Sequence, residues 1–319
     1  MELTIFSPGR TNARPRKPVG LLMLVLVGSW AAEAKLNIIA TTPDLAAIAR
    51  SVGGDRVEIT TLVRPTEDAH FIDAKPSFIV KLNRADALIE GGAELESGWL
   101  PALLAGARNP KLAEGQPGRI SARIGIQMLE VPEKLDRSQG DLHASGNPHY
   151  LIAPSNARMV AATLAQGLSQ LDPAGAEIYQ AAMRSFQQEL DTKLASWKSK
   201  LSAHKGRQMI AYHNSWIYFA TEFELKVDHL MEPKPGVPPS ASRLGALIKT
   251  IQEEDIRIVL AEPYLSRRLP ETLSEKSGIR IVPVSQFPGG IKGTDRGYIE
   301  LLDTLVTAIA EGLSQPLKH

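Results

Sequence analysis

The stretch AGAEIYQAAMRSFQQELDTKLASWKSKL, Ala174–Leu201, decides the fold because it separates two similar patterns of strands and helices. Its apolar residues, among them Ile178, Phe186, Leu190 and Leu194, keep one face of a helix apolar. No glycine or proline interrupts it after Gly175. A helix over the whole stretch would be roughly 42 Å long at 1.5 Å per residue. This length predicts a rigid strut that joins two lobes.

Short β-branched runs alternate with amphipathic runs on both sides of this helix. The alternation predicts an α/β fold, in which each lobe has a mostly parallel sheet flanked by helices. We expect lobes at 35–172 and 204–319, with 173–203 as the connecting helix. The expected strands are Leu36–Thr41, Val57–Val63, Ala87–Ile89, Ile126–Val131, Gln208–Tyr212, Lys226–Leu230, Arg257–Ala261 and Ile279–Val284. The other expected helices are Phe78–Asn83 with Ser77 as its cap, Trp99–Ala107, Asn156–Leu171, Trp216–Phe223, Ser242–Glu253, Pro270–Lys276 and Tyr298–Leu313.

Residues 1–34 have the features of a cleavable signal peptide. Basic residues from Arg10 to Lys17 precede the apolar core Gly20–Gly28, GLLMLVLVG. This core is too short for a membrane-spanning helix, which needs about 20 apolar residues. Ala32-Glu33-Ala34 supplies the small residues that signal peptidase accepts, so we expect the mature chain to begin near Lys35. An uncleaved membrane anchor is the alternative.

The chain has no cysteine, and its charges are nearly balanced. The lack of cysteine excludes disulfides and a lipid-modified cysteine, so we expect a periplasmic protein that is not a lipoprotein. The first 34 residues hold four of the 36 basic and two of the 35 acidic residues, which leaves 32 and 33. This balance lacks the basic footprint of nucleic-acid-binding proteins. We expect a monomer with no nucleic-acid partner.

Three histidines and a glutamate fall where an α/β sheet binds its ligands, beyond the carboxyl ends of strands. His70 lies in the loop after the second expected strand, and His213 directly follows the strand that ends at Tyr212. His149 precedes a helix, and Glu262 ends a strand. Imidazole is the commonest zinc ligand in proteins. The set predicts a transition-metal site between the lobes, although any single histidine of this kind can be a solvated or structural residue.

The remaining histidines fit a metal site less well. We expect His229 to pack inside a strand and His204 to be solvated, and His319 is the last residue. His143 stands in the loop Asp141-Leu-His143-Ala-Ser-Gly, close to His149 in the sequence. An accessory role for His143, such as a transient ligand during loading, stays open.

Several motifs together resemble one known family, the zinc and manganese substrate-binding proteins of bacterial ABC transporters, which include the zinc-uptake and TroA-like proteins. The resemblance covers nearly the whole mature chain. It rests on Thr41-Thr42-Pro43-Asp44-Leu45, Glu67-Asp68-Ala69-His70-Phe71, Pro76-Ser77, Gly146-Asn147-Pro148-His149, Tyr212-His213-Asn214 and Ala261-Glu262-Pro263.

The resemblance implies two lobes joined by a rigid helix, with a metal ion in the cleft between them. It implies His70 and His149 as ligands from the first lobe and His213 from the second. It also implies that the protein is not an enzyme, and that it delivers its ion to an ABC permease in the inner membrane.

The chain departs from the family at the expected fourth ligand. Many members carry an aspartate after the last strand, and this position falls near Ser285. Glu262 is the candidate replacement, with water, Asp68, His143 or Asp295 as alternatives. Because manganese favours sites rich in carboxylates, the departure favours zinc over manganese.

Other functions are compatible with parts of the sequence. A manganese-binding protein of the same transporter type is the nearest alternative. A zinc hydrolase would use three histidines and an open position, with Glu262 or Glu67 as base. A binding protein for a solute other than a metal would tolerate loss of the histidines, and a periplasmic zinc buffer would work without a permease.

Overall fold

The computed structural model describes residues 1–7, 9, 35–134, 143–234 and 236–318. The chain divides into two units, Met1–Glu33 and Ala34–His319. In the first unit, residues 1–7 and 9 are exposed and form no helix or strand. The core and cleavage site of the predicted signal peptide lie outside the described residues. Within the described residues, none of the helices combines the length and the apolar character that a membrane crossing requires.

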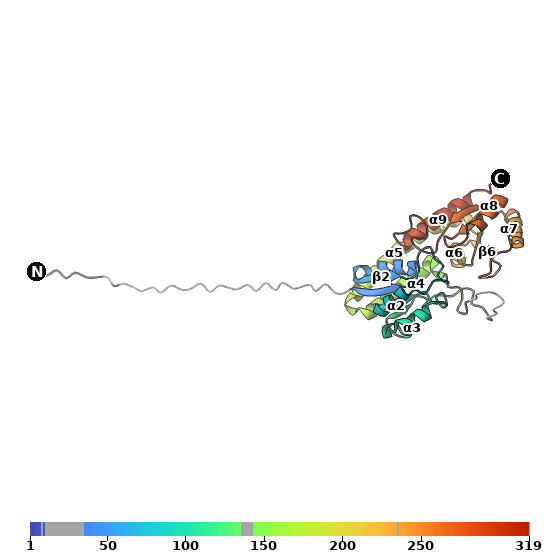
Figure 1. Cartoon of the computed structure of the whole chain (residues 1–319). Coiled ribbons are helices and arrows are strands. Elements are labelled where there is room, and N and C mark those ends of the chain that lie inside the picture. Colours follow the sequence, from blue (N-terminus) through green and yellow to red (C-terminus); the bar gives the residue numbers. More distant parts are fainter. Residues whose placement is uncertain (8, 10–34, 135–142, 235, 319) are drawn as a thin grey trace. The chain divides into compact units, whose positions relative to one another are not determined.

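The second unit contains two parallel four-stranded sheets. The first sheet has the order β2-β1-β3-β4, and the second has the order β6-β5-β7-β8. In Figure 1, β2, α2 and α3 lie toward one end of this unit, and β6, α7 and α8 lie toward the other. The strands are β1 (Leu36–Ala40), β2 (Val57–Thr61), β3 (Ala87–Glu90), β4 (Arg119–Ser121), β5 (Gln208–Ala211), β6 (Lys226–Leu230), β7 (Ile258–Ala261) and β8 (Arg280–Pro283).

Nine α-helices are described, and they confirm the α/β alternation. They are α1 (Pro43–Gly53), α2 (Pro76–Arg84), α3 (Leu100–Ala107), α4 (Pro154–Leu171), α5 (Ala176–Leu201), α6 (Ile217–Glu222), α7 (Ala241–Glu253), α8 (Arg268–Ser277) and α9 (Tyr298–Ser314). The expected cap Ser77 is wrong, because α2 begins at Pro76 with Lys75 as its N-cap. Proline suits the first helical position, where its missing N–H would have had no partner.

The expected strand at Ile126–Val131 is also wrong. The fourth strand is β4, and residues 126–131 form a loop. Gly125 and Glu130 have φ values of 80° and 54°, which an extended strand does not contain. Val131 is 55% exposed, so part of this apolar run faces solvent. Residues 126–131 belong to a loop that contacts the half of the molecule containing the second sheet, as described below.

The long helix α5 connects the two halves as predicted. Near its beginning, Tyr179 donates a hydrogen bond of 2.6 Å to Asp172, which also pairs with Arg56 of the first half. Near its end, Trp197 donates a hydrogen bond of 2.6 Å to Asp303 of α9.

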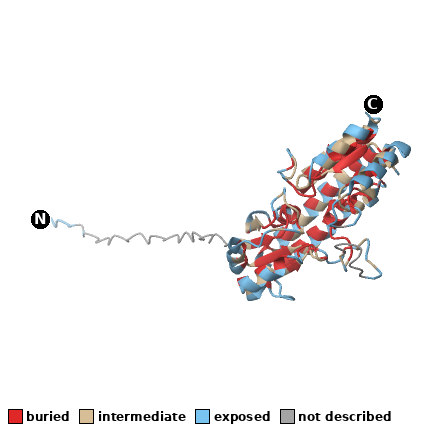
Figure 2. Cartoon of the chain, turned by 45° about the vertical axis from the view of Figure 1, so that its right-hand side comes forward, coloured by how far each residue is buried: buried red, intermediate tan, exposed pale blue. Residues whose placement is uncertain are grey.

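One hydrophobic cluster runs from the first sheet through α4 and α5 to α9 and the second sheet. Figure 2 shows buried residues, in red, along the whole folded unit. A shared core of this kind opposes large independent movement of the two halves.

Candidate metal centre

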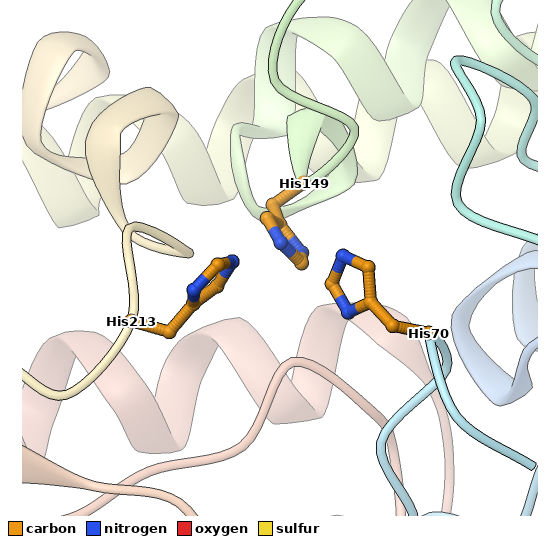
Figure 3. Close-up of side chains that lie close together, drawn as sticks. All are labelled: His70, His149 and His213. Atoms are coloured by element: carbon orange, nitrogen blue, oxygen red, sulfur yellow. The ribbon is translucent and has the colours of Figure 1, made fainter. Parts of the chain in front are cut away.

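The histidines His70, His149 and His213 meet although they are far apart in the sequence. His70 follows β2, His213 follows β5, and His149 precedes α4. Figure 3 shows their rings turned toward a common point. One ligand atom of each lies within 4.8 Å of those of the other two. The structure therefore brings together the three histidines that the strand-end argument selected.

The spacing of the three rings matches what one bound ion requires. The ring centroids are 5.0 Å apart for His70 and His149, 5.5 Å for His70 and His213, and 5.2 Å for His149 and His213. With Zn–N bonds of about 2.0–2.1 Å, the centroids of tetrahedral imidazole ligands lie about 5.2 Å apart. The rings can accordingly accept an ion with little movement.

Carboxylates hold two of the rings from behind. Nδ1 of His70 lies 2.8 Å from Oδ1 of Asp68, and Nδ1 of His213 is hydrogen-bonded to Oε1 of Glu232. An acceptor at Nδ1 places the proton there and leaves the lone pair of Nε2 for a metal. The negative charges also compensate an incoming cation.

An amide holds the third ring. Nδ1 of His149 lies 2.7 Å from Oε1 of Gln286, and Nε2 of Gln286 donates hydrogen bonds to Glu262 and Tyr264. These donations fix the amide so that its oxygen faces His149. In the part of the chain that the structure describes, Nε2 of His70 and Nε2 of His149 are buried and have no hydrogen-bond partner. Buried nitrogens without partners are costly unless a ligand satisfies them.

Burial and neighbouring charges shift the pKa values of His149 and His213 in opposite directions. Burial lowers the pKa of His149 well below its ordinary value, and the neighbouring histidines lower it further. Burial also lowers the pKa of His213, but the hydrogen bond and charge of Glu232 outweigh burial and raise it above its ordinary value. His149 is therefore neutral and ready to bind at neutral pH, whereas protons compete more strongly at His213.

The expected fourth ligand does not join the group. Glu262 is buried, and its Oε1 accepts hydrogen bonds from Tyr264 at 2.9 Å and from Gln286 at 2.8 Å. It is not among the residues whose ligand atoms lie within 4.8 Å of one another. Ser285 is also turned away, because its hydroxyl is bonded to the backbone N–H and carbonyl of Phe287. The role of Glu262 as a ligand stays a prediction, and this geometry gives it no support.

The other histidines take different places. His143 lies near the centre, with its ring centroid 5.2 Å from that of His70. His229 is in β6 but pairs with Glu254 at 3.0 Å and is part-exposed, so the expected packing role is wrong. His204 is part-exposed and lies 3.3 Å from Ser314. His319 lies outside the described residues.

A polar cluster ties the loops of two histidines together. Asn147 donates hydrogen bonds to Glu130 at 3.0 Å and to the carbonyl of Asn214 at 2.7 Å, and Asn214 donates to both carboxylate oxygens of Glu130. Asn147 also accepts the backbone N–H of His149 at 3.0 Å. We call Glu130, Asn147 and Asn214 the clasp. It connects the loop of His149 to the loop of His213 directly.

Sequence reasoning did not select Glu232, Gln286 or the clasp. Glu232 follows β6 and Gln286 follows β8, so the rule that chose the histidines also covers these two residues. The clasp has no such signal, since Glu130 lies in a loop that was expected to be a strand.

Comparison with known proteins agrees with this architecture. Residues 38–312 match the family described as "Zinc-uptake complex component A periplasmic". The chain is 25% identical to the iron-binding protein YfeA of Yersinia pestis, over 88% of this chain and 87% of that protein. It is 21% identical to the manganese ABC transporter substrate-binding lipoprotein PsaA of Streptococcus pneumoniae, over 88% and 90%.

A crystal structure of ZnuA has the same fold. It aligns with a TM-score of 0.75 at 25% identity, over 88% of this chain and 99% of that chain. The two sheets, the long helix and the family match agree with one another. The chain therefore belongs to the family of the periplasmic component of zinc-uptake complexes, whose members are extracytoplasmic binding proteins, not enzymes, that capture metal ions for ABC transporters.

Proposed function

We propose that this protein captures zinc in the periplasm through His70, His149 and His213 and delivers it to the permease of an ABC importer. The observation that carries the proposal is the composition of the group within 4.8 Å, which among the described residues holds three imidazoles and no carboxylate. Manganese favours oxygen ligands, whereas imidazole suits zinc. The names of similar proteins mention iron, manganese or zinc, so these names do not select one metal. The preference for zinc therefore rests on the three imidazole ligands.

The surroundings of the rings support the same choice. Hydrogen bonds to Asp68, Glu232 and Gln286 orient all three rings before an ion arrives, which lowers the cost of binding. The chain has no cysteine to carry a lipid, which supports a free periplasmic protein although PsaA is a lipoprotein.

Calorimetric titration of chelator-stripped protein with zinc tests the proposal. We expect tight binding of about one zinc ion per chain, and at least about 100-fold weaker binding after replacement of His70, His149 or His213 by alanine, because a tetrahedral site loses a ligand. His229→Ala is the matched control, since His229 pairs with Glu254 at the surface. Absence of zinc binding, or equal binding by the three variants, would disprove the proposed function.

A further inference from the structure

Three histidines do not complete the coordination of a zinc ion. Zinc held by protein ligands is almost always four-coordinate, so three imidazoles leave one position to fill. Beside the centre lies a cavity of about 150 Å³, which is lined by residues that include Asp68, His70, His143 and His213.

The carboxylates around the centre already have partners. Asp68 is bonded to His70, Glu232 to His213, and Glu262 to Gln286 and Tyr264. One oxygen of each carboxylate thus orients a neighbouring group, and none of the three belongs to the group within 4.8 Å. Asp295 is exposed and does not line the cavity.

His143 is the remaining nitrogen donor at this cavity. Its ring centroid is 5.2 Å from that of His70, which is the spacing expected of two imidazoles on one ion.

The backbone beside His143 is anchored. Ser145 donates hydrogen bonds through its N–H and its hydroxyl to Glu94, at 3.2 and 2.7 Å. The N–H of Gly146 donates to the carbonyl of His143 at 3.1 Å. The backbone position of His143 beside the cavity therefore follows from described contacts.

We propose that His143 is the fourth zinc ligand and that it completes a site made only of imidazoles. The inference rests on the proposed metal function and assigns the position that an aspartate fills in many relatives. The nitrogens of His143 are not in the group within 4.8 Å, so its side chain turns inward when the ion binds. A site of this kind has no anionic ligand, which disfavours manganese.

X-ray absorption of the zinc-loaded full chain, together with zinc titration, tests this assignment. The spectrum of the wild type should fit four imidazoles, and that of His143→Ala should fit three plus an oxygen. We expect His143→Ala to weaken zinc binding at least about 10-fold. His143→Asp should regain part of the affinity and raise the affinity for manganese relative to zinc, because it supplies a carboxylate.

The control is His229→Ala, because His229 pairs with Glu254 at the surface. This variant should keep four imidazoles in the absorption spectrum. The assignment is overturned if His143→Ala keeps the wild-type spectrum and affinity. Failure of the proposed function looks different, because the wild type itself would then bind no zinc.

Discussion

Burial and polar neighbours set how strongly protons compete with a metal at His149 and His213. Glu232 shows this most directly, because its hydrogen bond and charge overcome burial and raise the pKa of His213. Gln286, which is neutral, plays the same orienting part for His149, and the pKa of that ring stays low. One centre thus combines a ring that is readily deprotonated with one that holds its proton longer.

Glu232→Gln should change both affinity and its pH dependence. A metal binds only neutral imidazole, so affinity is highest above the pKa of His213 and falls as pH drops through it. Loss of the carboxylate should weaken zinc binding about 10–100-fold at pH 8. The substitution should also lower the pKa of His213. The difference in zinc affinity between the variant and the wild type should therefore become smaller toward pH 6. If the ratio of the zinc affinities of the two proteins stayed constant from pH 8 to pH 6, this result would contradict the account.

At the level of elements, the two ligand loops are held by contacts that do not involve the metal. The clasp joins the loop before α4 to the loop after β5, and Tyr218 adds hydrogen bonds to the carbonyl of Asn147 and the N–H of Leu129. Glu130 adopts a φ of 54°, an unfavourable value for a residue with a side chain, at the centre of this network. The clasp thereby sets the separation of His149 and His213 before an ion arrives.

Glu130→Ala should release both asparagines and loosen the two loops. We expect zinc to dissociate about 3–10 times faster, because part of the preorganisation is lost while every ligand remains. Stopped-flow chelation measures this rate. Glu133→Ala is the matched control, since Glu133 is an exposed residue of the same loop. Equal dissociation rates for the Glu130 variant and the wild type would show that the clasp does not position the site.

Elements with a local signal were predictable from the sequence, and those defined by tertiary contacts were not. The strand β1 and the helix α5 follow from β-branched runs and from helical spacing. The helix α1 was not predicted from the sequence. It is buried along most of its length and lacks the polar face that marks a helix. The same limit applies to the centre. Strand ends indicated His70 and His213, whereas Glu130 lies in a loop and is recognised only by its contacts with Asn147 and Asn214.

At the scale of the whole molecule, buried acids make the stability of the metal-free protein depend on pH. Burial raises the pKa of Glu96 to about 7, against hydrogen bonds from Thr41, Gly91 and Gly92. The folded protein therefore binds a proton that the unfolded chain releases near its ordinary value of 4.5. The stabilising contribution is complete below that value and is lost as pH rises through about 7.

Glu96→Gln removes this titration and keeps a neutral side chain of similar size. Relative to the wild type, the variant should gain free energy of unfolding between pH 5 and pH 8, on the order of 2 kcal/mol. Chemical denaturation of metal-free protein at the two pH values gives this difference. Asp44 is also buried, but it is present in both proteins, so its contribution cancels. If the difference in free energy of unfolding between the two proteins did not change with pH, Glu96 would not be the group that binds this proton.

Competition among metals tests the central claim most directly. Metal-stripped protein is mixed with equal amounts of zinc, manganese and iron(II) under anaerobic conditions, and the bound metal is measured by elemental analysis. An imidazole centre predicts about one zinc ion per chain, with the other two metals nearly absent. Predominant binding of manganese or iron would contradict the account.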